Sequence, residues 1–150
     1  MSLKYSLFII LCVAYFKVKA QTLLNADLVQ IKKEVYSQKG GAEKAVVRKN
    51  GETGSYYKKV TFYYPTPMEG NPCIFRTTFY LTSKNKCLKY VNEYWGDELP
   101  IQKINELTKF YPDLKKINNL KWIDSKNRTE INLIQDKQIS AAYSLEIKSF

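Results

Sequence analysis

The sequence contains no histidine. Nucleophile activation of the Ser-His-Asp or Cys-His kind needs an imidazole that titrates near neutral pH, so both mechanisms are excluded. Zinc also loses its commonest protein ligand. An enzyme built from this chain would have to use carboxylates, lysine, tyrosine or a cofactor, and we expect neither a cofactor nor a metal site.

Cysteine is scarce, with three residues in a chain of 150. Cys12 falls in an apolar stretch near the N-terminus, which leaves Cys73 and Cys87. Two cysteines in an exported chain suggest a disulfide. The hairpin expected over residues 74–95 separates these positions by roughly 30 Å, however, and the Cα atoms of bonded cysteines lie within about 7 Å. We therefore expect reduced cysteines.

The sequence also lacks an apolar run of the roughly 20 residues that span a bilayer. Its longest run, Leu7–Phe16, is flanked by lysines, as in the core of a signal peptide. Val18 and Ala20 are small residues at the positions that signal peptidase requires. We therefore expect residues 1–20 to be a cleaved signal peptide and residues 21–150 to form one domain.

Two other interpretations of the first segment remain open. A lipoprotein would need a small residue before its modified cysteine, whereas Cys12 follows Leu11. An uncleaved anchor would keep the segment in a membrane. The cleaved signal peptide is favoured, and it predicts a secreted or periplasmic protein without a later transmembrane segment.

Acidic residues are few, 14 against 24 lysines and arginines, so that the formal net charge is +10. The expected signal peptide carries three lysines and no acid, and the remaining chain stays basic. A basic balance can indicate nucleic acid, an anionic cell surface or an acidic polymer as partner. Because the lysines from Lys32 to Lys148 are scattered among the acids, the sequence favours a solvated basic surface.

Hydrophobic periodicity predicts one helix followed by four strands. The helix covers residues 25–38 and ends at Gly40 and Gly41. Beyond it the pattern alternates, and turn residues separate the alternating segments. The apolar stripe of the helix consists of Leu24, Leu28, Ile31 and Val35. The four strand segments are 44–49, 56–64, 74–82 and 87–95.

The third and fourth segments can be paired by residue number across the loop 83–86. Phe79 then opposes Tyr90 on a face that we expect to line the core. Arg76 opposes Glu93 on the other face. The remaining predicted pairs are Phe75 with Tyr94, Leu81 with Leu88, Ile74 with Trp95 and Thr78 with Val91.

A second helix is expected after Asp97, which stands at the position of an N-terminal cap, and Pro112 ends it. Its apolar residues are Ile101, Ile104, Leu107 and Phe110. A connection through Leu114, Ile117 and Leu120 then leads to a short strand around Trp122.

The last elements form a hairpin. Its two apolar rows fall on odd residue numbers, so they share a face only if the loop has an odd length, most simply Gln135–Lys137. The rows are Thr129, Ile131 and Leu133, then Ile139, Ala141, Tyr143, Leu145 and Ile147. The order α-β-β-β-β-α-β-β-β predicts an α+β domain, with an antiparallel sheet of about seven strands and two helices packed on one face.

Three motifs are only weak evidence for a catalytic or metal site. Ser-x-x-Lys occurs at Ser55–Lys58 and Ser83–Lys86, but one match opens a strand and the other is a loop, without the accompanying motifs of penicillin-recognising enzymes. A calcium loop at Asp124–Glu130 would place Lys126 and Arg128 where oxygen ligands are needed, so we expect a polar turn. Paired acids for glycoside chemistry would come from Glu93, Asp97, Glu98, Glu106 and Asp113.

Aromatic residues are plentiful along the second to fourth strand segments. Half of them are expected in the core, and the others must face outward. Tyr57 and Tyr63 fall on one strand face with Lys59 between them, and exposed tyrosine beside lysine suits sugars, peptides or an anionic protein. We nominate Tyr57, Lys59 and Tyr63 as the binding residues.

The sequence therefore favours a small exported, non-enzymatic binding module, inhibitor-like or associated with the cell envelope, whose partner is a protein, a peptide, a glycan or an anionic surface. The alternative is a histidine-free hydrolase that acts on envelope glycans through two carboxylates. A single-strand nucleic-acid binder is disfavoured because of the expected export.

Overall fold

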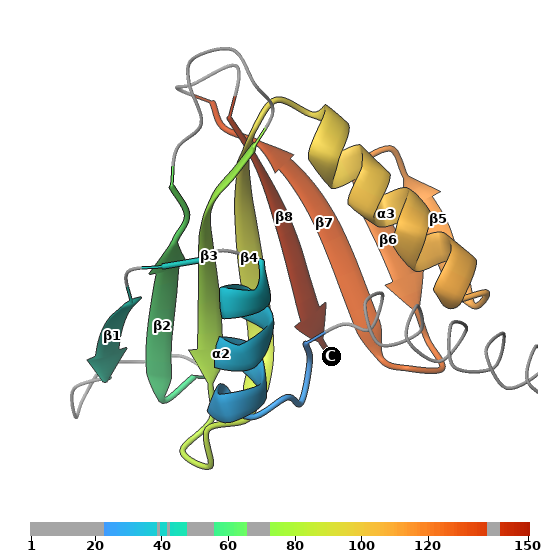
Figure 1. The fold of residues 1–150 in the computed structure, drawn as a ribbon. Helices are drawn as coiled ribbons and strands as arrows, with labels where there is room; N and C mark the ends of the chain where they lie inside the picture. Colours follow the sequence, from blue (N-terminus) through green and yellow to red (C-terminus); the bar gives the residue numbers. More distant parts are fainter. Residues whose placement is uncertain (1–22, 39, 42, 48–55, 66–72, 138–141) are drawn as a thin grey trace, which may run out of the picture.

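The computed structural model describes residues 23–38, 40–41, 43–47, 56–65, 73–137 and 142–150 (Figure 1). The expected signal peptide, Cys12, Ile139 and Ala141 lie outside these residues. The described chain forms one antiparallel sheet with two helices, which confirms the α+β class. Neither of these helices has the length and apolar composition needed to cross a membrane.

Each half of the described chain is one helix followed by four strands. The first half contains α2 (Leu28–Ser37), β1 (Glu43–Val47), β2 (Lys58–Tyr63), β3 (Cys73–Leu81) and β4 (Cys87–Trp95). The second half contains α3 (Glu98–Phe110), β5 (Leu114–Asn118), β6 (Lys121–Asp124), β7 (Thr129–Gln135) and β8 (Ala142–Ser149). We call them the β1–β4 half and the β5–β8 half.

The two halves join into a single sheet with the strand order β1-β2-β3-β4-β8-β7-β6-β5. They meet where β4 pairs with β8, and both helices lie on one face of the sheet (Figure 1). The predicted number of about seven strands is wrong, because the segment expected as a connection forms the edge strand β5. Only Leu114 is buried in β5, so the strand has no alternating apolar pattern that sequence could detect.

Helix α2 begins one turn later than predicted because Asp27 caps it. The Asp27 carboxylate accepts a hydrogen bond from the Gln30 backbone N–H, and the Gln30 side chain accepts one from the Asp27 N–H. Ile31 and Val35 of the predicted stripe are fully buried. Gly40 follows closely, and a Cβ there would lie 2.3 Å from Cγ1 of Val35, so the chain needs a glycine to turn away from the helix.

Helix α3 differs from the prediction in two details. Asp97 stands at the N-cap position, as predicted, but it has a helical backbone conformation and its side chain makes no capping hydrogen bond. Ile101 is 43% exposed, whereas Pro100, Ile104 and Leu107 are buried. Spacings of four and three follow the 3.6-residue helical turn, while the predicted every-third alignment drifts off the buried face.

The predicted β3–β4 register is confirmed in its centre, from Arg76 opposite Glu93 to Tyr80 opposite Lys89. Thr78 opposite Val91 and Phe79 opposite Tyr90 are therefore also confirmed. The register shifts by one residue at each end, because Phe75 and Leu88 are extra residues at β-bulges. The pairs of Phe75 with Tyr94, Leu81 with Leu88 and Ile74 with Trp95 are therefore wrong.

Each bulge changes which side chain enters the core. Cys87 opposes Leu81 and is fully buried in place of Leu88. The Phe75 ring stacks on Trp95, with the two ring centroids 5.0 Å apart. Cys73 opposes Trp95 at the far end of the hairpin, and both described cysteines are free, as predicted. Burial raises the pKa of the Cys87 thiol to about 12.

In the final hairpin the predicted core face is confirmed, but the predicted loop is wrong. Ile131 opposes Ile147 and Leu133 opposes Leu145, and all four are buried on the helix side of the sheet. Gln135 still pairs with β8, so the predicted loop Gln135–Lys137 is wrong and the connection is longer.

The core lies between the sheet and the two helices. Phe79 occupies its centre, with its ring stacked on Tyr90 and edge-on to Phe62. Neither α2 nor α3 lies on the opposite face of the sheet (Figure 1), and we call it the open face.

Candidate binding surface

The open face of the β1–β4 half is hollowed. Thr61 and Thr78 form the floor of this depression, with their hydroxyl oxygens 3.2 Å apart, and they are only 7% and 5% exposed because longer side chains surround them. The depression has a volume of about 420 Å³. We call it the hollow, and its lining residues are Lys44, Val46, Lys59, Thr61, Tyr63, Arg76, Thr78, Tyr80, Val91 and Glu93.

Three cations line the hollow, and they differ in their partners. Arg76 binds Glu93 through two hydrogen bonds, which raise the pKa of the guanidinium, and the Tyr63 hydroxyl also contacts it. Within the described residues, neither Lys44 nor Lys59 has a carboxylate in ion-pair contact. The hollow therefore offers two lysines whose charges are not neutralised by a described neighbour.

The Tyr80 ring of the hollow has two lysine ammonium groups beside it. The Lys59 ammonium lies 5.8 Å from the centre of the Tyr80 ring, and that of Lys89 lies 4.5 Å from it. Tyr56 also packs against the Tyr80 ring in a T-shaped arrangement, with the two ring centroids 5.0 Å apart. Tyr80 thus has little ring surface left for stacking on another molecule.

Two of the three nominated binding residues meet in the hollow. Lys59 and Tyr63 alternate with the buried residues of β2 and line it together. Tyr57 is exposed but precedes β2 and does not line the hollow. Sequence reasoning missed Lys44 and Arg76, because they come from neighbouring strands and only the sheet register brings them beside Lys59 and Tyr63.

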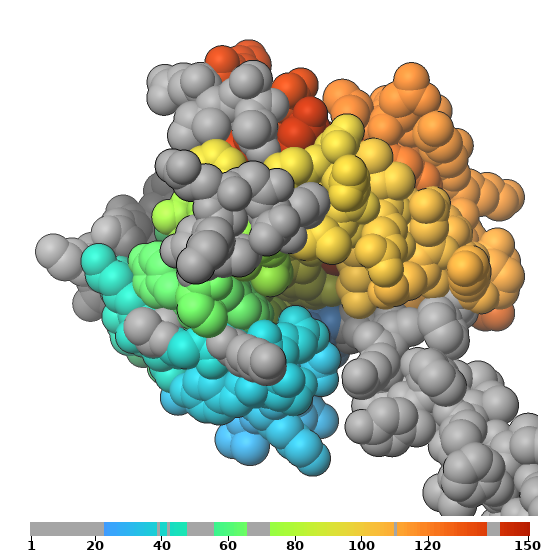
Figure 2. Space-filling view, turned by 45° about the horizontal axis from the view of Figure 1, so that its top comes forward, coloured from blue at the N-terminus to red at the C-terminus, as the bar shows by residue number. Residues whose placement is uncertain are grey.

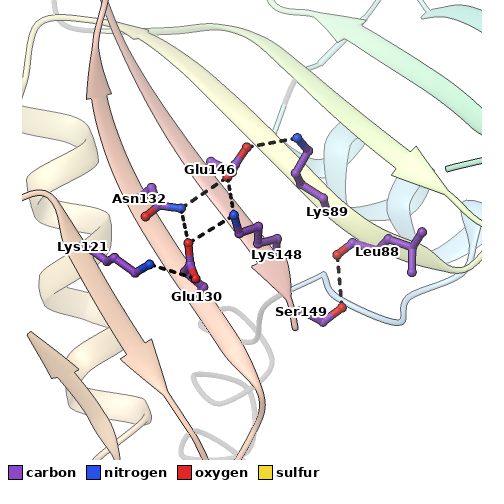
Figure 3. A network of polar contacts seen from close by, with 8 residues as sticks. All are labelled: Leu88, Lys89, Lys121, Glu130, Asn132, Glu146, Lys148 and Ser149. Carbon is purple, nitrogen blue, oxygen red and sulfur yellow. Dashed lines mark hydrogen bonds and ion pairs between the residues drawn. The ribbon is translucent and has the colours of Figure 1, made fainter. Parts of the chain in front are cut away.

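The open face of the β5–β8 half has a different arrangement, in which lysines and glutamates bind one another (Figure 3). Lys148 contacts both Glu130 at 3.1 Å and Glu146 at 3.3 Å. Lys121 also contacts Glu130, and Lys89 of β4 contacts Glu146. We call this cluster the charge network, and it comprises Lys89, Lys121, Glu130, Asn132, Glu146 and Lys148.

The charge network stabilises the ionised forms of its glutamates. The Asn132 amide donates to Glu130 at 2.9 Å, and together with Lys121 and Lys148 it lowers the pKa of Glu130 to about 2. Burial alone would raise the pKa of Glu146, but the hydrogen bond and the charge of Lys89 lower it. The charges on this part of the open face are therefore largely matched.

The helix face contains a cleft between α2 and α3, visible as the recess between the cyan and yellow helices in Figure 2. Its volume is about 250 Å³. We call it the interhelical cleft. Its lining residues are Leu23, Glu34, Val35, Gln38, Tyr64, Ile74, Thr77, Phe79, Tyr90, Asn92, Tyr94, Leu99, Gln102, Lys103 and Glu106.

The floor of the interhelical cleft is polar. The Thr77 hydroxyl donates to Oδ1 of Asn92 at 2.9 Å, and both side chains are buried. The Tyr64 hydroxyl contacts Thr77, and the Tyr94 hydroxyl contacts Asn92. Burial raises the pKa of both tyrosines, so their hydroxyl groups stay protonated and are available as donors.

The acids considered for glycoside chemistry are dispersed. Only Glu106 lines the interhelical cleft, and Glu93 lies on the opposite face of the sheet. Asp113 contacts Lys126 at 3.4 Å. Asp97 and Glu98 are exposed at the start of α3. The second acid in the cleft is Glu34 of α2, which sequence reasoning missed because nothing distinguishes it from an ordinary solvated helix residue.

The segment considered as a calcium loop forms a turn, as expected. Asp124 is almost fully buried, and its carboxylate accepts hydrogen bonds from the Asn127 backbone at 2.9 Å and side chain at 2.7 Å. Among the described residues no cluster of histidine, cysteine, aspartate and glutamate is arranged to hold a metal ion.

Comparison of the chain with protein-family models, with curated proteins and with solved structures finds no match.

Proposed function

We propose that this protein is an exported, non-enzymatic binding module, and that its hollow binds an acidic segment of a partner protein. The observation that carries this proposal is the pair of lysines, Lys44 and Lys59, which line the hollow without a described carboxylate in ion-pair contact, since Glu93 of the hollow pairs with Arg76. Partner carboxylates would supply the missing charge and would desolvate against the threonine floor.

The aromatic residues favour a carboxylate partner over a sugar. A sugar that stacks on aromatic side chains needs an open ring face. Two lysines flank the Tyr80 ring, and the Tyr63 hydroxyl contacts Arg76, so both tyrosines position cations. The chemistry presented by the hollow is therefore that of ammonium groups held at the edge of a concave surface.

Binding of a fluorescent oligoglutamate peptide, measured by anisotropy at low and high salt, tests the proposal. The double variant Lys44→Gln/Lys59→Gln should bind about tenfold more weakly, as expected for the loss of two partly exposed ion pairs. Added salt should weaken binding to the wild-type protein.

The matched control is Lys33→Gln/Lys115→Gln, which removes the same charge from exposed positions outside the hollow. Equal losses of affinity in the two double variants would mean that the peptide responds to net charge alone, and the hollow would then not be the site. Stronger competition by alginate, a carboxylated polysaccharide, than by oligoglutamate would favour a glycan partner and contradict the proposal.

The expected export has its own test. Mass spectrometry of the protein recovered from its native host should show Gln21 as the first residue, in its free form or cyclised. Recovery of a chain that starts at Met1 in a membrane fraction would instead identify an anchor.

The hydrolase alternative would place Glu34 and Glu106 at the centre of the chemistry, since both line the interhelical cleft. Each of them is held by its own helix, Glu34 by Gln38 at 2.6 Å and Glu106 by Lys103 at 3.8 Å. Release of reducing ends from purified peptidoglycan by the wild-type protein, and not by Glu106→Gln, would overturn the non-enzymatic proposal.

A further inference from the structure

The interhelical cleft has a different electrostatic character from the rest of this basic chain. Glu34 and Glu106 face it from opposite helices, and Lys103 is the cation among its lining residues. Lys103 contacts Glu106, whereas no described cation lies within ion-pair distance of Glu34. Burial is the main reason that the pKa values of Tyr64 and Tyr94 are raised, and the charges of Glu34 and Glu106 add to this effect. The negative potential thus reaches the floor of the cleft.

The inner walls of the cleft are apolar. Leu23, Ile74 of β3 and Leu99 of α3 line it and are partly exposed, while Val35 and Phe79 lie almost fully buried behind them. Its volume of about 250 Å³ is smaller than that of pockets for drug-sized ligands, which is roughly 300–1,000 Å³. The size suits a single side chain or a molecule of similar length.

The floor supplies polar groups that are not fully used. Asn92 accepts from Thr77 and contacts the Tyr94 hydroxyl, but a side-chain amide has two donors and can accept more than one hydrogen bond. The amide is buried, and among the described residues it has no further partner. A buried amide with unused capacity at the bottom of a cleft is available to a bound molecule.

We propose that the interhelical cleft binds a primary alkylamine, with its aliphatic stem against Leu23, Ile74 and Leu99 and its ammonium group at Glu34. Such a group is supplied either by a lysine side chain of a partner or by a free amine. An apolar stem with a cationic head matches the cleft in length, in polarity and in charge. This site is on the opposite face of the sheet from the hollow and would take a ligand of the opposite charge. The failure of one proposal would therefore not contradict the other.

NMR titration of the ¹⁵N-labelled protein tests this proposal, with the backbone amides of Thr77 and Asn92 as reporters. The probes are Nα-acetyl-lysine-N-methylamide, which mimics a lysine side chain, and cadaverine, which is a free amine. At least one of them should give saturable shifts with a dissociation constant of roughly millimolar order, as expected for a ligand of this size. Tighter binding of the lysine mimic identifies a partner side chain as the source, and tighter binding of cadaverine identifies a free amine.

Three controls separate the cleft from general charge effects. Glu34→Gln should weaken binding about tenfold through loss of a charge-assisted hydrogen bond. Glu98→Gln removes a carboxylate from α3 outside the cleft and should leave the affinity unchanged. The norleucine analogue, which has the stem without the ammonium group, should bind much more weakly than the lysine mimic.

The proposal is overturned if neither amine gives saturable shifts, if the norleucine analogue binds as tightly, or if Glu34→Gln and Glu98→Gln have the same effect. The spectrum of Glu34→Gln outside the cleft should match the wild-type spectrum, because Glu34 lies on the surface of α2 and glutamine is an equally good helix former.

Discussion

The β1–β4 half and the β5–β8 half have the same sequence of elements and contribute to the same sheet, but their open faces differ. In the charge network every lysine contacts Glu130 or Glu146. In the hollow, Lys44 and Lys59 have no described carboxylate in contact. On the open face, lysines that have a glutamate on a neighbouring strand are therefore paired with it, whereas Lys44 and Lys59 have no such contact and are the residues to which we assign binding in our proposal.

The helix faces of the two halves, by contrast, resemble each other. Both bury aromatic or aliphatic rows against a helix, and the rows are continuous across β4 and β8. The arrangement of lysines and glutamates therefore distinguishes the two halves on the open face, whereas the apolar core is common to both.

The largest expected effect tests whether the shared core unites the two halves. Phe79→Ala should destabilise the protein by about 3–5 kcal/mol, as is usual for aromatic truncation in a core. Phe79 is 1% exposed and contacts both Phe62 and Tyr90. Urea denaturation followed by fluorescence and by circular dichroism measures the loss.

Leu88→Ala is the control, because Leu88 lies at a bulge and is only half-buried. It should cost clearly less than Phe79→Ala. If the variant of Phe79 unfolds in two steps, with the β5–β8 half still folded after the first, the two halves are separate cooperative units and their common core does not unite them.

The sequence predicted the core of this fold well where alternation and turn chemistry agree. Phe79 opposite Tyr90 followed from the apolar row and the four-residue loop, and the structure confirms it. The bulges at Phe75 and Leu88 could not be predicted, since each bulged residue follows another apolar residue, Ile74 or Cys87, and either register places one of the two on the core face. The edge strand β5 was missed because pairing with β6, and not its own pattern, forms it.

The candidate sites were less predictable than the core. The sequence places Lys59 and Tyr63 on one face of a strand, and that much was correct. Lys44 and Arg76 join them only through the sheet register. The interhelical cleft depends on how α2 and α3 lie relative to one another on the sheet. Glu34 and Asn92 are therefore ordinary residues in the sequence, and only the fold brings both of them to one cleft.

A smaller effect is expected from the charge network. Glu130→Gln should cost about 1–2 kcal/mol at neutral pH, because it weakens contacts with Lys121 and Lys148 that a carboxylate makes on a side chain only 15% exposed. Urea midpoints of the wild-type protein and the variant, measured across a pH series, give this difference.

The pH dependence of that difference has a definite sign. The pKa of Glu130 is lowered in the folded protein from 4.5 to about 2, so the stabilisation is complete above about pH 4.5 and is lost as the pH falls towards 2. The stabilities of wild type and Glu130→Gln should therefore converge in acid. A difference that stays constant over this range would show that the network does not favour the ionised carboxylate.

The smallest expected effect concerns Arg76 and Glu93, which decide how many free cations the hollow contains. The Arg76 side chain is 41% exposed, so its pairing with Glu93 should contribute only about 0–1 kcal/mol in a double-mutant cycle of Arg76→Gln and Glu93→Gln. A cycle of Lys115→Gln with Glu93→Gln should give no coupling, because Lys115 lies on the far edge strand.

The register itself can be measured by NMR. Contacts between opposed backbones should place Arg76 opposite Glu93, and contacts that place it opposite Asn92 or Tyr94 would contradict the register. If the register holds but the coupling is absent, Arg76 joins Lys44 and Lys59 as an unmatched cation, and Arg76→Gln should then weaken oligoglutamate binding as much as Lys59→Gln. If the coupling is present, Arg76→Gln should weaken that binding less than Lys59→Gln, because the Glu93 carboxylate already neutralises the Arg76 charge through two hydrogen bonds.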